Sequence, residues 1–224
     1  MSEPTGVAEA EAAPGTPPAP SFEVLGAQPV AHAVAPTLRF GLRVGDPSGR
    51  SLHGIALAVQ VNIDPAKRTY DAATKARLVE LFGAPERWAA TTRSFLWAQV
   101  GVLVPPFRGE TGFRVDVACT YDLELAAAKY FHSLPGGEIP LTFHFSGTML
   151  YSGEDERLQI SMVPWSCSAG YKLPVETWRG LMALYYPGGG WVRVETATLD
   201  RLAARKAQRG LPTYEATIAE LLDD

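Results

Sequence analysis

The sequence predicts a mainly β protein of the α+β class, an antiparallel β-sandwich or curled sheet with one inserted helix and about three C-terminal helices. Two observations support this prediction. Segments with alternating apolar residues follow one another through the middle of the chain, and helical patterns cluster after residue 173. Strands grouped before helices are typical of this class, whereas a wound βαβ fold alternates the two. No repeat period is visible, which disfavours a solenoid or a propeller.

The strands are predicted from period-two patterns. Apolar residues alternate with polar or small ones from Leu38 to Val44 and again from Ile55 to Ile63, as expected for half-buried strands. Pro47 and Gly49 lie between the two runs and suit a turn, so we predict a hairpin over residues 37–64. Further strands are predicted as an edge strand at 22–25, longer ones at 94–104, 113–123, 140–151 and 157–168, and a short one at 191–195.

The helices are predicted from their capping residues. Thr69 can cap the inserted helix, and Gly83 suits its C-terminal end. Pro174 suits the first turn of the next helix, in which Val175 and Trp178 share a face. Two further helices are expected to be capped by Thr198 and Thr213.

The N-terminal region differs in composition from the rest. Residues 1–20 contain five Pro and five Ala and no aromatic residue, so they cannot bury enough apolar area to offset the entropy of ordering. We predict a disordered acidic Pro/Ala-rich tail at 1–20 and a single β-rich globular domain at 21–224. Residues 1–38 contain four acidic residues and no basic ones, which accounts for the net charge of −4. The neutral remainder argues against nucleic-acid binding, because phosphate neutralisation needs a basic surplus.

The chain shows no secretory signal and no apolar run long enough to span a membrane. We therefore expect a cytoplasmic protein, whose two cysteines remain free thiols. Cys119 lies on the apolar face of a predicted strand, where a buried, inert thiol is expected. Cys167 follows Pro164-Trp165-Ser166 and is expected to be more exposed.

The sequence lacks the motifs of common catalytic sites. It has no phosphate-binding Gly-rich loop ending in Lys-Ser/Thr, no Gly-x-Ser-x-Gly elbow and no closely spaced His pair for zinc. This favours a non-catalytic protein with no cofactor and no metal. The alternative is an enzyme with a site on the polar face of the sheet. If that face lines a cleft, four side chains could converge there for metal or acid–base chemistry: Asp116, Asp122, His132 and His144.

The aromatic residues allow two interpretations. They can be core material, or they can line a hydrophobic groove for another protein, since Trp and Tyr are enriched at interface hot spots. The residues concerned are Trp88, Trp97, Trp165, Trp178, Trp191, Tyr185 and Tyr186. Another protein is therefore the expected partner. A further alternative is a peptide- or client-binding module that resembles export chaperones and uses a sheet edge by strand addition.

Several segments resemble an uncharacterised actinobacterial family, a domain of unknown function. The similarity covers most of the chain from about residue 22 onward, and it is carried by residues 22–24, 36–40, 121–124, 129–131, 137–148, 163–167 and 210–213. Genes of that family often lie near those of uptake nickel–iron hydrogenases. The resemblance therefore implies an accessory factor for hydrogenase assembly or function, and it brings no catalytic residue or ligand with it.

Overall fold

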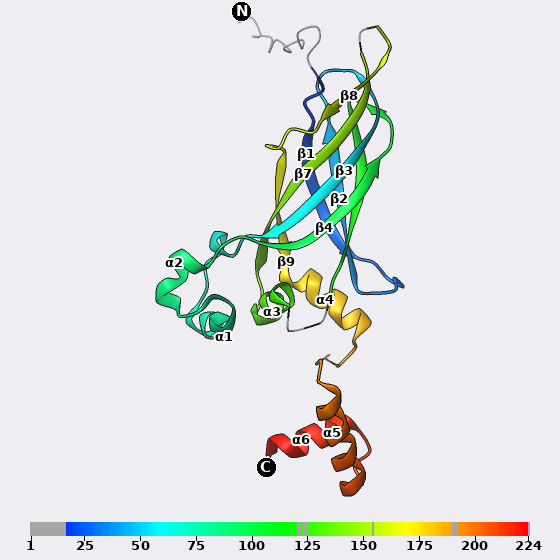
Figure 1. The fold of residues 1–224 in the computed structure, drawn as a ribbon. Helices are drawn as coiled ribbons and strands as arrows, with labels where there is room; N and C mark the ends of the chain where they lie inside the picture. The colour runs from blue at the N-terminus through cyan, green and yellow to red at the C-terminus, as the bar shows by residue number, and fades with distance from the viewer. Residues whose placement is uncertain (1–16, 121, 123–124, 154, 190–191, 224) are drawn as a thin grey trace, which may run out of the picture. The chain divides into compact units, whose positions relative to one another are not determined.

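A computed structural model describes residues 17–120, 122, 125–153, 155–189 and 192–223. Residues 1–16 of the predicted tail lie outside the described residues, as does Trp191. The contacts within the chain divide it into two compact units, Met1–Gly189 and Gly190–Asp224. All the described strands belong to the first unit (Figure 1).

One sheet of the first unit, here called sheet A, contains three antiparallel strands in the order β1-β2-β6. They are β1 (Ser21–Pro29), β2 (Thr37–Gly45) and β6 (Glu110–Ala118). In β2 the apolar residues predicted to face the core are buried, and the residues between them are half-buried. The predicted edge strand at residues 22–25 is confirmed as part of β1.

The other sheet, sheet B, is built around two long strands, β3 (Ser51–Ile63) and β7 (Glu138–Ser152). Its main order is β4-β3-β7-β8, while β9 also pairs with β7 and the short β5 pairs with β3. The remaining bounds are β4 (Phe95–Val104), β5 (Phe107–Arg108), β8 (Leu158–Met162) and β9 (Ser168–Pro174). Of the strand predicted at 157–168, residues 158–162 form β8, whereas residues 163–167 form no strand and β9 begins only at Ser168. These two strands pair with different halves of β7.

The predicted hairpin over residues 37–64 is wrong. β2 pairs with β1 and β6, whereas β3 pairs with β4, β5 and β7, so the turn between β2 and β3 crosses from one sheet to the other. In that turn the buried Asp46 accepts a hydrogen bond from the backbone N–H of Ala19 at 3.0 Å. A period-two pattern identifies a strand with one buried face, but it does not say which strand lies beside it.

The two sheets pack face to face and share one hydrophobic core. The ring of Phe40 on β2 meets the ring of Phe143 on β7 edge to face, with centroids 5.1 Å apart. The ring of Phe22 on β1 stacks on Phe145 at 4.0 Å. The prediction of a mainly β, antiparallel α+β sandwich is confirmed.

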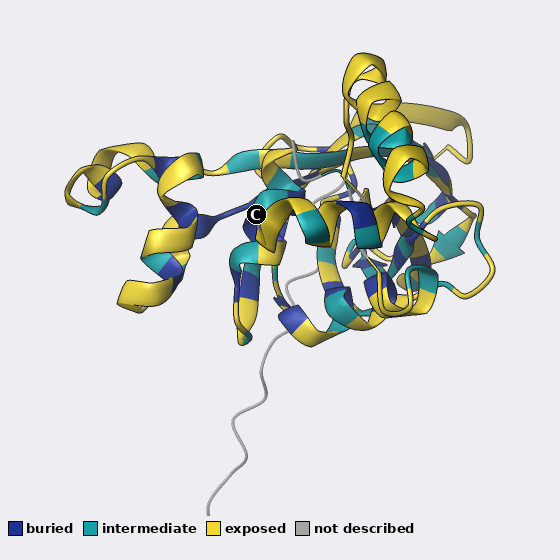
Figure 2. Ribbon diagram, turned by 90° about the horizontal axis from the view of Figure 1, so that it is seen from below, coloured by how far each residue is buried: buried dark blue, intermediate teal, exposed yellow. Residues whose placement is uncertain are grey.

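Helices interrupt and follow the sheets. Between β3 and β4 lie η1 (Pro65–Lys67), α1 (Ala72–Phe82), η2 (Pro85–Arg87) and α2 (Trp88–Thr91); α3 (Ala126–Ser133) precedes β7, and α4 (Val175–Tyr185) follows β9. Asp71, not Thr69, caps α1, because its carboxylate accepts the N–H of Thr74 at 2.6 Å. Exposed and buried segments alternate along the helical ribbons in Figure 2. The helix α3 was not predicted from the sequence, although its short run of alanines favours a helix.

The second unit contains α5 (Thr196–Arg209) and α6 (Tyr214–Asp223). The first of these begins two residues before the predicted cap Thr198. The predicted cap of α6 is confirmed, since the hydroxyl of Thr213 accepts the N–H of Ala216 at 3.0 Å. Residues 192–195, predicted as a strand together with Trp191, form no strand. Glu220 on α6 forms ion pairs with Arg205 and Arg209 on α5.

Candidate functional site

Asp116, the first residue of the predicted polar-face group, lies on the outer surface of sheet A. Its neighbours Val115 and Val117 are buried, so its side chain points away from the core. Arg39 on β2 donates two hydrogen bonds to the carboxylate, both at 2.7 Å. These hydrogen bonds and the charge of Arg39 lower the pKa of Asp116. The carboxylate is therefore an ionised, paired surface group.

His144 lies on the outer surface of sheet B. It is exposed between the buried Phe143 and Phe145, as the sequence predicts, and it pairs with Gln60 on β3 and Ser168 on β9. Asp116 and His144 therefore occupy the outer faces of opposing sheets, with the core between them. The structure does not bring these two side chains together.

The remaining two predicted residues lie near the helices. The backbone N–H of Asp122 donates to the hydroxyl of Thr120 at 3.0 Å. His132 is exposed in the last turn of α3, at the edge of a shallow cavity that Trp178 and Met182 also line. Within the described part of the chain, no three His, Cys, Asp or Glu residues lie close enough together to hold a metal ion.

A second cavity, of about 300 Å³, is lined by the ends of β4 and β6 together with α3 and α4. β4 contributes Trp97, α3 contributes Phe131 and α4 contributes Trp178. The ring of Phe131 joins the two indoles, with centroids 5.0 Å from Trp97 and 5.6 Å from Trp178. None of the eleven described lining residues carries a charge: they are Leu96, Trp97, Ala118, Cys119, Thr120, Leu125, Ala126, Ala127, Ala128, Phe131 and Trp178.

The only sulfur among the described lining residues is the thiol of Cys119. Burial raises its pKa to about 12, so the thiol is protonated and unreactive at neutral pH. Its Sγ lies 3.6 Å from the carbonyl oxygen of Val117. The prediction of a buried Cys119 is confirmed.

The aromatic residues divide between core and surface. Trp97 and Trp178 line the cavity, and Trp88 is buried in the helical insert, where its indole N–H donates to the carbonyl of Gly83 at 2.8 Å. Trp165 is 92% exposed in the loop between β8 and β9. The hydroxyl of Tyr185 bonds to the backbone of Val30 and Ala33.

The strand β8, at an edge of sheet B, exposes a row of apolar side chains. Leu158, Ile160 and Met162, here called the β8 stripe, are each 60–67% exposed. In register they lie beside Ser152, Leu150 and Thr148 of β7, on the outer face of the sheet. Across the same face, Ala56 of β3 pairs with both Thr148 and Leu103, and Leu103 is also exposed.

The side chains of β8 are arranged in the opposite way to those of an ordinary half-buried strand, with the apolar ones on the outer face and the polar ones on the inner face. Gln159 and Ser161 share the face of the buried Tyr151 and Met149, and the hydroxyl of Ser161 is buried without a hydrogen-bond partner among the described residues. A strand selected for stability alone would place its apolar residues on the core side. The β8 stripe was not predicted, although apolar and polar residues alternate over residues 158–162 of the sequence.

This sandwich with its helical insert places the chain among β-rich α+β proteins, and comparison with known families identifies it further. A family model described as "Family of unknown function (DUF6084)" matches residues 17–224. The chain therefore belongs to that family. No curated protein matches the chain.

Solved structures show only distant similarity. The CARDB domain of the PF1109 protein from Pyrococcus furiosus, solved in complex with di-metal ions, is 11% identical, with 70% of this chain and 92% of that chain covered and a TM-score of 0.29. A beta-glucosidase from Kluyveromyces marxianus is 7% identical, with 69% and 15% covered and a TM-score of 0.26. Neither similarity supports an argument about function. None of the helices in the described residues is long and apolar enough to cross a membrane.

Proposed function

We propose that this chain is a non-catalytic binding factor that docks a partner protein on the free edge of β8. The observation that supports the proposal is the β8 stripe, three large apolar side chains exposed on an edge strand. Natural edge strands are usually protected by charged side chains or proline. The five residues of β8 include neither.

Strand addition is the binding mode that suits this surface. The outer edge of β8 pairs with no strand in the described part of the chain, so its backbone groups are available to an extended segment of the partner. Apolar side chains on that segment would pack against the β8 stripe and, one strand further in, against Leu150 of β7 on the same face. The partner is therefore expected to present an extended apolar segment.

The test is a matched pair of lysine substitutions. A partner is captured through a photo-crosslinker at Ile160, purified, and its Kd measured with Ile160→Lys and with Leu25→Lys. Leu25 is a similarly exposed leucine, but on the edge strand of sheet A. Ile160→Lys is expected to weaken binding by about tenfold or more, while Leu25→Lys changes it little, because burying an unpaired charge is costly.

Two results would overturn the proposal. One is equal binding by both variants. The other is a concentration-dependent dimer of this chain that Ile160→Lys abolishes, with no other protein crosslinked from residue 160, since the edge would then serve self-association. Hydrogen exchange provides a separate check: partner binding is expected to slow exchange of the β8 amides and leave the β1 amides unaffected.

The family resemblance suggests a narrower form of this proposal, in which the partner is a subunit or maturation protein of a nickel–iron hydrogenase. An affinity pull-down of the tagged, full-length chain from its native host, under mild crosslinking, is expected to recover such proteins. Normal hydrogenase activity in a strain that lacks the gene would contradict the narrower form and leave the docking proposal to its own test.

A further inference from the structure

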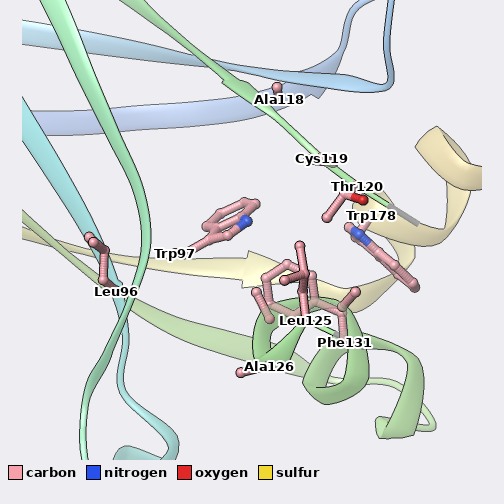
Figure 3. Close-up of a pocket in the computed structure, with 11 residues that line it drawn as sticks. Leu96, Trp97, Ala118, Cys119, Thr120, Leu125, Ala126, Phe131 and Trp178 are labelled. Atoms are coloured by element: carbon pink, nitrogen blue, oxygen red, sulfur yellow. The ribbon is translucent and has the colours of Figure 1, made fainter. Parts of the chain in front are cut away.

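The cavity between β4, β6, α3 and α4 contains hydrogen-bond donors that the fold leaves unused. Trp178 is only 4% exposed, yet its indole N–H donates to no acceptor among the described residues. The more exposed Trp97 likewise has no acceptor there. Figure 3 shows the two indoles on either side of the cavity, with their nitrogens turned toward its interior.

This donor on Trp178 needs an acceptor, because indole N–H groups inside a fold normally find a partner. Trp88 in the same unit follows that rule through its hydrogen bond to Gly83. The nitrogen of Trp178 is not sealed in the core, since its residue lines the cavity. An acceptor placed inside the cavity would satisfy it.

We infer that this cavity is a binding site for a small uncharged molecule with an apolar or aromatic body and a carbonyl oxygen. The oxygen accepts the indole N–H of Trp178, with Trp97 and the hydroxyl of Thr120 as further donors. The body packs against Phe131 and Leu125. This site is separate from the β8 stripe and does not depend on the proposed docking function.

The chemical class of the ligand follows from the residues that line the cavity. The volume of about 300 Å³ lies at the lower end of the range for ligand pockets, about 300–1,000 Å³, which combine apolar walls with a few placed polar groups. A carboxylate or an ammonium group is disfavoured, because no described lining residue offers an opposite charge to offset its desolvation. A neutral carbonyl needs only the donors that are present.

The experiment uses two probes of nearly equal shape, acetophenone and ethylbenzene, of which only the first has a carbonyl. Binding to the full-length chain is followed by the ¹H–¹⁵N signals of the tryptophan indoles, with the Trp178 signal assigned through Trp178→Phe. We expect acetophenone to shift the Trp178 signal strongly. Its affinity is expected to fall about tenfold in Trp178→Phe, the value of one hydrogen bond, while ethylbenzene affinity changes little.

Two further variants control the experiment. Trp165→Phe removes an exposed indole outside the cavity and is expected to leave both affinities unchanged. Ala127→Leu fills the cavity from α3 and is expected to abolish binding of both probes. If Trp178→Phe does not fold, Trp97→Phe tests the same donor set at a more exposed position. The inference is overturned if acetophenone leaves the Trp178 signal unmoved, or if removing the indole nitrogen weakens both probes equally.

Discussion

Gly147 on β7 lies so close to Ala56 on β3 that a Cβ added to it would sit 2.0 Å from the Ala56 carbonyl oxygen. Its φ of 146° also lies in a region that L-residues avoid. The two longest strands of sheet B thus depend on a residue without a side chain at their contact. Immediately beyond this point β7 begins to pair with β8.

The first prediction concerns that contact. Gly147→Ala is expected to lower the free energy of unfolding by about 3 kcal/mol or more, because both the backbone conformation and the clash oppose a Cβ. Urea unfolding measures the effect. Gly101→Ala is the matched control, since Gly101 lies on the neighbouring β4 with open space around it. Equal stabilities of the two variants would contradict the prediction.

The second prediction concerns two tyrosines. The hydroxyl of Tyr70 donates to the carbonyl of Pro65 at 2.8 Å, so it accepts from the hydroxyl of Tyr130 at 2.7 Å. Tyr70→Phe leaves the fully buried Tyr130 hydroxyl without an acceptor and is expected to cost about 2–3 kcal/mol. Tyr130→Phe leaves Tyr70 bonded to Pro65 and is expected to cost about 1 kcal/mol. A larger loss of stability in Tyr130→Phe would show that the hydrogen bonds run the other way.

The third prediction concerns the Cys119 thiol. Burial raises its pKa from 9.0 to about 12, so the thiol stays protonated in the folded protein at pH values where the unfolded chain ionises. Its contribution to stability is present below pH 9 and lost as pH rises towards 12, by about 1.4 kcal/mol per pH unit. Urea unfolding of Cys119→Ala at pH 10 and 11 is expected to show a flatter alkaline decline. Cys167→Ser, at a less buried thiol, is expected to retain the steep decline.

The fourth prediction concerns Asp64, which lies where β3 leads into the helical insert. Burial by itself raises the pKa of Asp64, but hydrogen bonds from Lys67, Thr142 and Ser94 outweigh it, and the pKa lies below its ordinary value. Because the folded pKa is lowered, the stabilisation is present above about pH 4 and lost as pH falls through the folded pKa.

Asp64→Asn is therefore expected to destabilise the protein by about 1–3 kcal/mol at pH 7 and by much less at pH 2. Thermal unfolding at the two pH values measures this difference. Asp155→Asn, at an exposed residue, is the control and is expected to show little effect at either pH. A cost of Asp64→Asn that does not change with pH would contradict the prediction.

The sequence predicted which segments form strands and helices far better than it predicted which strands pair with one another. Alternation from Leu38 to Val44 identified β2, and Thr213 identified the cap of α6, because both signals are local. The hairpin prediction failed at the turn after β2, where the same turn residues suit a crossing between sheets. The four polar residues were predicted to converge on one polar face, yet Asp116 and His144 face opposite directions, since they lie on different sheets.

By itself, the sequence determined the mainly β class, the strand faces that become the core, the buried Cys119 and the lack of common catalytic motifs. These follow from periodicity and residue type within short segments. Only the tertiary structure decided that Trp97, Phe131 and Trp178 surround one cavity, and that the apolar face of β8 points to solvent. Residues 97 and 178, which are 81 positions apart, line one cavity because of sheet pairing and helix packing. No local pattern specifies which distant surfaces come together.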